Sequence, residues 1–114
     1  MILETIHTKV KGLKRSFKFL IQRMTRGWDD SETWSLDYSL GKLILPRLKR
    51  FRELNIAYPP DMTKEQWDSI IDQMIWSFEF ISSDKRWDCY DKEEWDKFYR
   101  GMTPFTEYYA NLWW

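Results

Sequence analysis

Apolar side chains in the first quarter of the chain recur at alternating spacings of three and four residues. They run from Val10 to Met24, and Gly27 follows the last of them. The five positions are Val10, Leu13, Phe17, Leu20 and Met24. This spacing places them on one face of an α-helix, and glycine most readily adopts the left-handed conformation at which helices end. The pattern predicts a first helix that ends at Gly27, with lysines and arginines on its other faces.

A second helix is expected to start near residue 30, because Asp29, Asp30 and Ser31 are favourable N-cap residues. Its apolar side is formed by Trp34, Tyr38, Gly41, Leu45 and Leu48 and is widened by neighbouring leucines. The second helix is therefore predicted to be the most buried and the central one. Because proline lacks an N–H and clashes with the preceding turn, the helix is expected to kink near Pro46 or to break there into two pieces, with freed carbonyls beside Arg47, Lys49 and Arg50.

The second half of the chain also has helical periodicity. Thr63-Lys-Glu-Gln66 has the form of a capping box, and an apolar stripe from Trp67 to Ile81 follows it. Residues 91–99 predict another helix, and Thr103-Pro104 predicts the start of a short terminal one. No segment alternates with period two in the manner of a strand. We therefore predict an all-α fold, a single compact bundle of four to five helices that forms one domain over residues 1–114.

Composition agrees with a folded protein, because 18% of the residues are aromatic and the formal net charge is zero. Cys89 stands alone, so it can form no intramolecular disulfide and no cysteine metal cluster. The chain has neither a basic leader followed by a long apolar run nor about 18 consecutive apolar residues. These features predict a protein of a reducing cytoplasm that does not span a membrane.

The zero net charge conceals a gradient. Residues 1–26 contain seven lysines and arginines against Glu4, whereas residues 63–114 contain six against eleven acidic residues. If the two ends pack together, the charges neutralise one another and imply no partner. If they lie apart, the first helix offers a cationic face to phosphates.

Catalytic chemistry has little support in these residues. The only histidine is His7, in a segment expected to be loose, so a Ser or Cys nucleophile lacks an evident base. Asp29, Asp30, Glu32 and Asp37 could gather around Mg²⁺, but helix capping explains the first two more simply. We therefore expect no enzyme activity, no metal and no cofactor.

Asp37 differs from the other acids because it lies inside the helix predicted to be most buried, so its charge needs a partner. Arg26 and Arg47 are the evident candidates for a structural ion pair. A ligand-facing acid is the alternative interpretation.

Binding has more support. Arg26, Arg47, Lys49 and Arg50 supply positive charge for a phosphate, and Trp28, Trp34 and Tyr58 supply flat faces on which a base could stack. With Asp37, these residues form the candidate site for a ligand or partner. Core packing is the alternative for each tryptophan, most clearly for Trp34, Trp67 and Trp76 and least for Trp28, which lies in a connection.

Several segments also carry a family resemblance: Arg26-Gly27-Trp28 with the acidic cap after it, residues 33–38, Leu45-Pro46-Arg47-Leu48, the Tyr58-Pro59 turn, residues 63–67, and the tyrosine-rich run into Leu112-Trp113. Through most of its length the chain resembles a family of small, uncharacterised proteins encoded by bacteriophages and prophages. Relatives end in Leu-Trp-Asp, whereas this chain has Trp114 at the last position. The resemblance implies a phage origin and an α-helical fold and no catalytic activity.

Three functional classes follow from these observations. The first is a host-takeover or anti-defence protein in the cytoplasm of the bacterial host, which sequesters a nucleotide-type signal or covers a host protein surface. The second is a nucleic-acid-binding accessory protein that uses the basic first helix, a reading that the sequence pI near 6.6 weakens. The third is a phage structural or assembly protein, for which Trp113 and Trp114 would serve an oligomer interface unless they dock into the fold.

Overall fold

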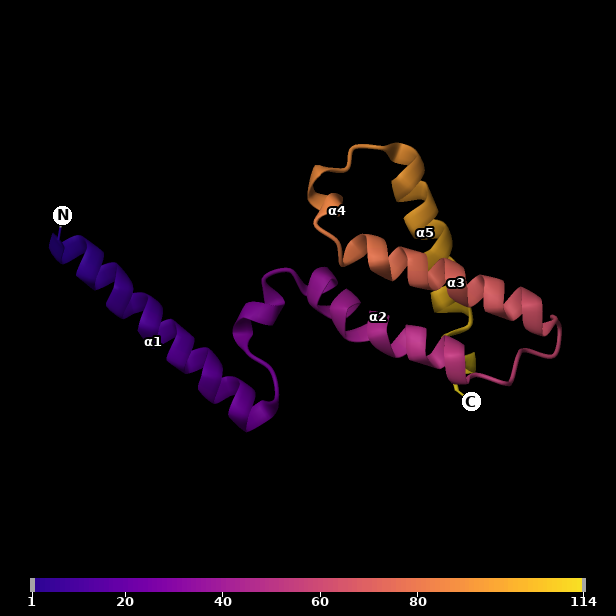
Figure 1. The fold of residues 1–114 in the computed structure, drawn as a ribbon, viewed down its shortest axis with the longest axis horizontal. Coiled ribbons are helices and arrows are strands. Elements are labelled where there is room, and N and C mark those ends of the chain that lie inside the picture. The colour runs from indigo at the N-terminus through magenta and orange to yellow at the C-terminus, as the bar shows by residue number, and fades with distance from the viewer. Residues whose placement is uncertain (1, 114) are drawn as a thin grey trace. The chain divides into compact units, whose positions relative to one another are not determined.

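The computed structural model describes residues 2–113, and these residues contain helices and no strands, which confirms the all-α prediction. Their contacts divide into two compact units. Unit 1 extends to Leu36 and unit 2 begins at Asp37. Each unit is described by itself below, and the helices of both are shown in Figure 1.

Unit 1 consists of helix α1 (Ile2–Arg26) and a 3-10 turn, η1 (Asp30–Thr33). Gly27 ends α1 as predicted, with φ of 87° and its N–H bonded to the Arg23 carbonyl at 2.9 Å. The helix starts earlier than the apolar stripe suggested and includes the segment around His7 that was expected to be loose. Asp29 forms a capping box with Glu32, but it caps η1 and not the long helix predicted to start there.

In unit 2, α2 (Leu36–Leu54) starts at the boundary between the units and continues through Pro46 without a break. Helix α3 (Lys64–Ile81) starts at the predicted capping box of Thr63 and Gln66. A single turn, α4 (Lys85–Asp88), leads to α5 (Lys92–Glu107), which also runs through its proline. The predicted start of a new helix at Pro104 is therefore wrong, and only a 3-10 turn, η2 (Tyr109–Asn111), follows α5.

The core of unit 2 is centred on α3 and not, as predicted, on the second helix. Seven residues of α3 are buried, whereas α2 contributes only Gly41 and Leu48. Trp67 is 1% exposed, which confirms its predicted core position. Leu40 and Leu43, which were expected to widen the apolar side of α2, are 46% and 50% exposed.

Two small residues allow α3 and α5 to cross closely. The Ser77 hydroxyl on α3 is fully buried and donates a 2.8 Å hydrogen bond to the Phe98 carbonyl on α5. A Cβ at Gly101 would overlap that hydroxyl and would lie 2.5 Å from the Gln73 carbonyl oxygen. This crossing fixes α5, and with it the C-terminal segment that lines the site described next.

Candidate binding groove

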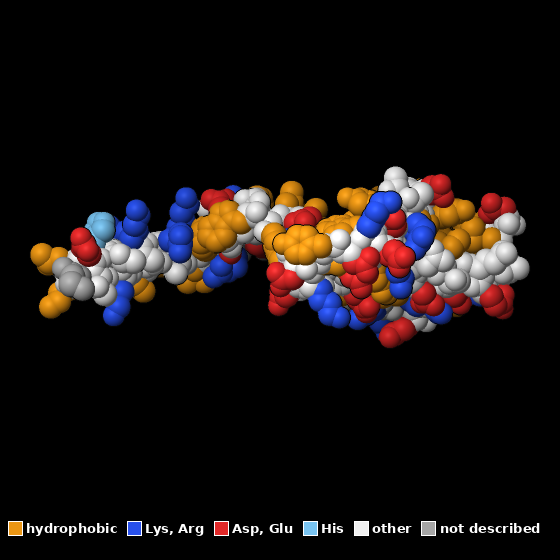
Figure 2. Space-filling model, turned by 90° about the horizontal axis from the view of Figure 1, so that it is seen from above, with side chains coloured by type: hydrophobic (Ala, Val, Ile, Leu, Met, Phe, Trp, Pro, Cys, Tyr) orange, Lys and Arg blue, Asp and Glu red, His pale blue; other side chains and the backbone are white. Residues whose placement is uncertain are grey.

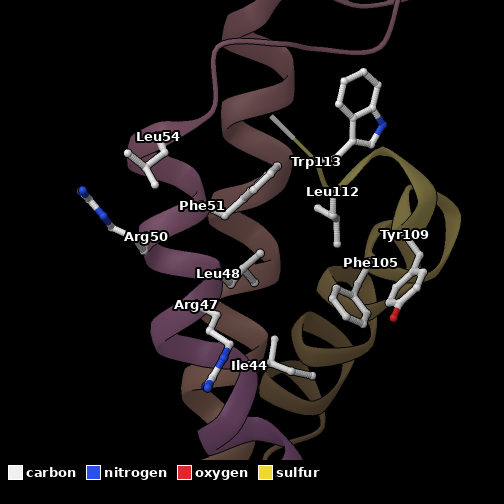
Figure 3. Close-up of a pocket in the computed structure, with 10 residues that line it drawn as sticks. All are labelled: Ile44, Arg47, Leu48, Arg50, Phe51, Leu54, Phe105, Tyr109, Leu112 and Trp113. Carbon is white, nitrogen blue, oxygen red and sulfur yellow. The ribbon is translucent and has the colours of Figure 1, made fainter.

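Unit 2 contains a groove of about 850 Å³ between α2 and the C-terminal segment, shown in Figure 3. Ile44, Arg47, Leu48, Arg50, Phe51 and Leu54 line it from α2, and Phe105, Tyr109, Leu112 and Trp113 line it from the other side. Seven of these ten side chains are apolar. The groove is therefore suited to hydrophobic contact.

The α2 wall follows from helical spacing, because residues three and four apart share one side of a helix. Ile44, Leu48 and Phe51 form that side and also pack on the core, so the wall is held in place from behind. Arg47 lies among them, and its Nη1 donates a 2.7 Å hydrogen bond to the Leu43 carbonyl. The carbonyl that Pro46 leaves without an N–H donor is that of Lys42, so this bond does not test the predicted kink and freed carbonyls, which stay predictions.

The opposite wall is anchored by aromatic contacts. Phe105 packs edge-on against core residue Phe78, with 4.9 Å between the ring centres, and Tyr109 packs edge-on against Phe105, with 5.7 Å between the ring centres. Tyr108 lies 5.5 Å from Trp67 on the core side. The wall is therefore built on the core and does not depend on an occupant for its position.

The end of the described chain completes this wall. Leu112 is half-buried against the core, whereas Trp113 lines the groove with 67% of its surface exposed. Trp113 is therefore not buried in the fold, Trp114 lies outside the described residues, and a role for these tryptophans at an oligomer interface stays a prediction.

Three predicted cations lie on this part of α2 with different surroundings. Arg47 and Arg50 line the groove, and Figure 3 shows the Arg50 guanidinium pointing away from the C-terminal wall. Arg50 forms a 2.7 Å ion pair with Glu53, and both side chains are 64% exposed, so the pair is weak. Lys49 forms a 3.0 Å ion pair with Glu79 of α3 and joins the two helices. The structure thus brings two of the three cations to the groove.

Asp37 forms the predicted structural ion pair, but both predicted partners are wrong, because its carboxylate accepts a hydrogen bond from Arg86. The Asp37 side chain is 56% exposed, whereas that of Arg86 is 4% exposed and lies over the Trp87 ring at 4.0 Å. The hydrogen bond from Arg86 lowers the pKa of Asp37, although partial burial acts in the opposite direction. Asp37 therefore compensates a buried guanidinium.

Tyr58 lies in the connection between α2 and α3, is 51% exposed and does not line the groove. The sequence predicted that Tyr58, together with Trp28 and Trp34 from the first third of the chain, supplies the aromatic faces of the site. The groove instead takes them from the C-terminal run, whose aromatic content was the signal that could have indicated it.

The other predicted site residues, Arg26, Trp28 and Trp34, belong to unit 1. The Arg26 guanidinium lies 3.7 Å from the centre of the Trp28 ring and forms a 2.6 Å ion pair with Asp30. Trp34 packs edge-on against Phe19 at 5.7 Å and is 67% exposed, so its alternative role as a core residue is wrong. Arg26 and Trp28 are thus engaged with each other and with η1.

Searches with the chain and its structure match no family model, no curated protein and no solved structure. Over residues 2–113, no helix combines the length and the apolar composition that crossing a bilayer requires. Within the same residues, His, Cys, Asp and Glu side chains form no group of three or more that could hold a metal ion.

Proposed function

We propose that this chain is a non-catalytic binding protein that captures an apolar segment of a partner protein in the groove of unit 2. The observation that carries the proposal is the lining of the groove. Apolar side chains dominate it, and among the described residues its polar members are Arg47, Arg50 and Tyr109. Preformed, mostly apolar grooves of this kind accept the hydrophobic side chains of a partner helix or strand.

The two arginines define the charge of the occupant. Arg47 and Arg50 lie on α2, at one side of the groove, where carboxylates next to the apolar segment of a partner would meet them. An acidic, amphipathic segment is the occupant that complements both features.

The resemblance to phage and prophage proteins supports the biological setting. We propose that the partner is a protein of the bacterial host cytoplasm and that covering its surface serves host takeover or the evasion of host defence. On this proposal the chain is an accessory protein that acts by occupancy and performs no chemical step.

Capture of a nucleotide-type signal is the second candidate. It is favoured by the two arginines, which could contact phosphates, and by Tyr109 and Trp113, on which a base could stack. It is weakened because the described lining contains no Asn, Gln, Asp, Glu, Ser or Thr side chain to read the edge of a base. Arg47 and Arg50 therefore fit the carboxylates of a protein segment at least as well as the phosphates of a nucleotide.

The first test compares full-length variants in co-purification from a bacterial host lysate. Wild type and Tyr90→Glu, a control altered at a 94% exposed tyrosine outside the groove lining, are expected to retain the same partner protein. Trp113→Glu and the double variant Arg47→Ala/Arg50→Ala are expected to lose that partner with little change in melting temperature, because these side chains are largely on the surface.

A thermal-shift screen of the wild type against mono-, di- and cyclic nucleotides accompanies it, since a ligand selective for the folded state raises the melting temperature. No shift is expected. A shift of several degrees that disappears in Arg47→Ala/Arg50→Ala would support the nucleotide alternative. A partner retained equally by all four proteins would place binding on another surface and contradict the proposal.

A further inference from the structure

Helix α1 of unit 1 carries a longer apolar stripe than the one that defined it in the sequence. Seven side chains follow one another at spacings of three and four residues in strict alternation. They are Leu3, Ile6, Val10, Leu13, Phe17, Leu20 and Met24. Their exposed fractions lie between 44% and 82%, and α1 has no buried residue. This is the heptad spacing with which a helix contacts another helix in a coiled coil.

Most contacts to α1 within unit 1 use sides of the helix away from the stripe, but Arg23, at a g position beside the stripe, pairs with Asp29. Phe19 packs against Trp34, and Gln22 and Arg26 bond to Asp30 of η1. In the heptad these three residues occupy positions that point away from the stripe. The segment that folds back on α1 therefore leaves the apolar stripe uncovered in unit 1.

Two lysines flank the stripe in its first half. Lys9 and Lys14 occupy the g and e positions beside it, and neither forms an ion pair with a described carboxylate of unit 1. On the other faces, Arg26 and Lys18 pair with Asp30, whereas Lys11 and Arg15 form no ion pair with a described carboxylate of unit 1. Figure 2 shows lysine and arginine side chains projecting from this helix between its hydrophobic ones. The charges of Lys9 and Lys14 lie where a coiled-coil partner places its own e and g residues.

A second copy of α1 does not complement this pattern. In a parallel pair, Lys9 of one helix would face Lys14 of the other, and an antiparallel pair would also bring like charges together. A membrane surface would attract the lysines, but the helices that lie on membranes present a broad apolar face and not a narrow seam with a 3.5-residue repeat.

We propose that α1 docks along its stripe on an amphipathic helix of a partner protein that has aliphatic residues at its a and d positions and Glu or Asp at its e and g positions. This surface is separate from the groove of unit 2, and the proposal does not rest on the function of the groove.

The test measures binding of the full-length protein to two fluorescent synthetic helices by anisotropy. Both helices contain three heptads with Ile and Leu at a and d. One has Glu at every e and g position and the other has Lys. The wild type is expected to bind the Glu-flanked helix and to bind the Lys-flanked helix at least about tenfold more weakly.

Variants of α1 separate the seam from the rest of the helix. Leu13→Glu is expected to weaken binding of the Glu-flanked helix by more than about tenfold, because it places a charge in the apolar seam. Lys9→Glu/Lys14→Glu is expected to reverse the preference in favour of the Lys-flanked helix. The control Lys11→Glu/Lys18→Glu makes the same change in net charge at positions outside the seam and is expected to keep the wild-type preference.

Equal binding of the two helices by the wild type, or the same response in the control and seam variants, would overturn the proposal. Loss of binding in Trp113→Glu would place the helix in the groove and would overturn it too. So would self-association of the wild type that Leu13→Glu abolishes. Binding to vesicles of phosphatidylserine and phosphatidylcholine without binding to either helix would identify α1 as a membrane-surface element and would equally overturn it.

Discussion

Replacing Gly101 by Ala is expected to destabilise unit 2, although the same change would stabilise an isolated helix by about 1 kcal/mol. The added methyl group would overlap the Ser77 hydroxyl and would lie 2.5 Å from the Gln73 carbonyl oxygen. Ser77 is fully buried and holds the Phe98 carbonyl, so it cannot turn away without breaking that bond, and the Gln73 oxygen belongs to the backbone. Relief therefore requires α3 and α5 to separate.

The expected magnitude follows from opposing contributions. Overpacking a close contact costs about 1–3 kcal/mol, and loss of a hydrogen bond costs about 1 kcal/mol. After the helical preference of alanine is subtracted from these costs, the free energy of unfolding is expected to fall by about 2 kcal/mol. For a domain of this size, this corresponds to a fall of about 10 °C in melting temperature. Thermal unfolding followed by near-UV circular dichroism measures it.

Gly12→Ala is the matched control, because a Cβ at Gly12 meets nothing within 4 Å. It is expected to leave the transition of unit 2 unchanged and to raise the helix content of α1 slightly. If Gly101→Ala is as stable as the wild type, the close crossing of α3 and α5 is not a feature of the protein in solution.

Three other changes have definite expected outcomes. Asp37→Asn is expected to lower stability at pH 7 by roughly 1–2 kcal/mol, because Arg86 then lacks its counter-charge. The pKa of Asp37 is lowered in the folded state, so the ion pair stabilises the fold above the pKa of Asp37 in the unfolded chain. This stabilisation is lost as the pH falls through the lower pKa of the folded state, so the stabilities of the two proteins in urea titrations should converge below about pH 4. A constant difference in stability at all pH values would contradict the pair. Gly27→Ala places a methyl group on a residue with φ of 87° and is expected to destabilise the end of α1 by about 1 kcal/mol. Faster amide hydrogen exchange in the last turn of α1 measures this loss. Unchanged exchange would exclude the left-handed cap. Thr63→Ala removes the cap of α3 and is expected to lower the urea midpoint by the equivalent of about 1 kcal/mol with an unchanged slope, and an unaltered midpoint would refute the capping box.

The elements that sequence predicted well are those fixed by local chemistry. Gly27 ends α1, and Thr63 with Gln66 starts α3, because capping depends on a few consecutive residues. The stripe of α3 is core because its apolar face is long and little interrupted by charge. These signals need no knowledge of the tertiary contacts.

The predictions of a helix break near Pro46 and of a new helix at Pro104 were wrong because the cost of a proline within a helix is local and its compensation is not. An interior proline costs a helix about 3 kcal/mol. Beyond Pro46, α2 packs Leu48 and Phe51 on the core, and beyond Pro104 the residue Phe105 meets Phe78, with each large apolar side chain contributing roughly 1.5–3 kcal/mol when buried. Tertiary packing therefore carries both helices through their prolines, and no local pattern indicates this.

The candidate site was predicted in part for a related reason. Arg47 and Arg50 reach the groove because they share helix α2 with its apolar wall. The partner of Asp37 could not be inferred, since Arg86 lies 49 positions further along the chain and pairs with it only in the tertiary fold. The aromatic wall likewise depends on where α5 places Tyr109 and Trp113, which follows from its crossing with α3.

Site-specific photo-crosslinking tests the central claim, that the groove of unit 2 holds a segment of a partner protein, most directly. Benzoylphenylalanine replaces Tyr109, which lines the groove, or Tyr90, which is 94% exposed outside the groove lining, in the whole chain expressed in bacterial cells. The account predicts one protein adduct from position 109 that is absent from position 90 and is lost when Trp113→Glu is added. Adducts of equal yield at both positions, or none at position 109, would contradict it.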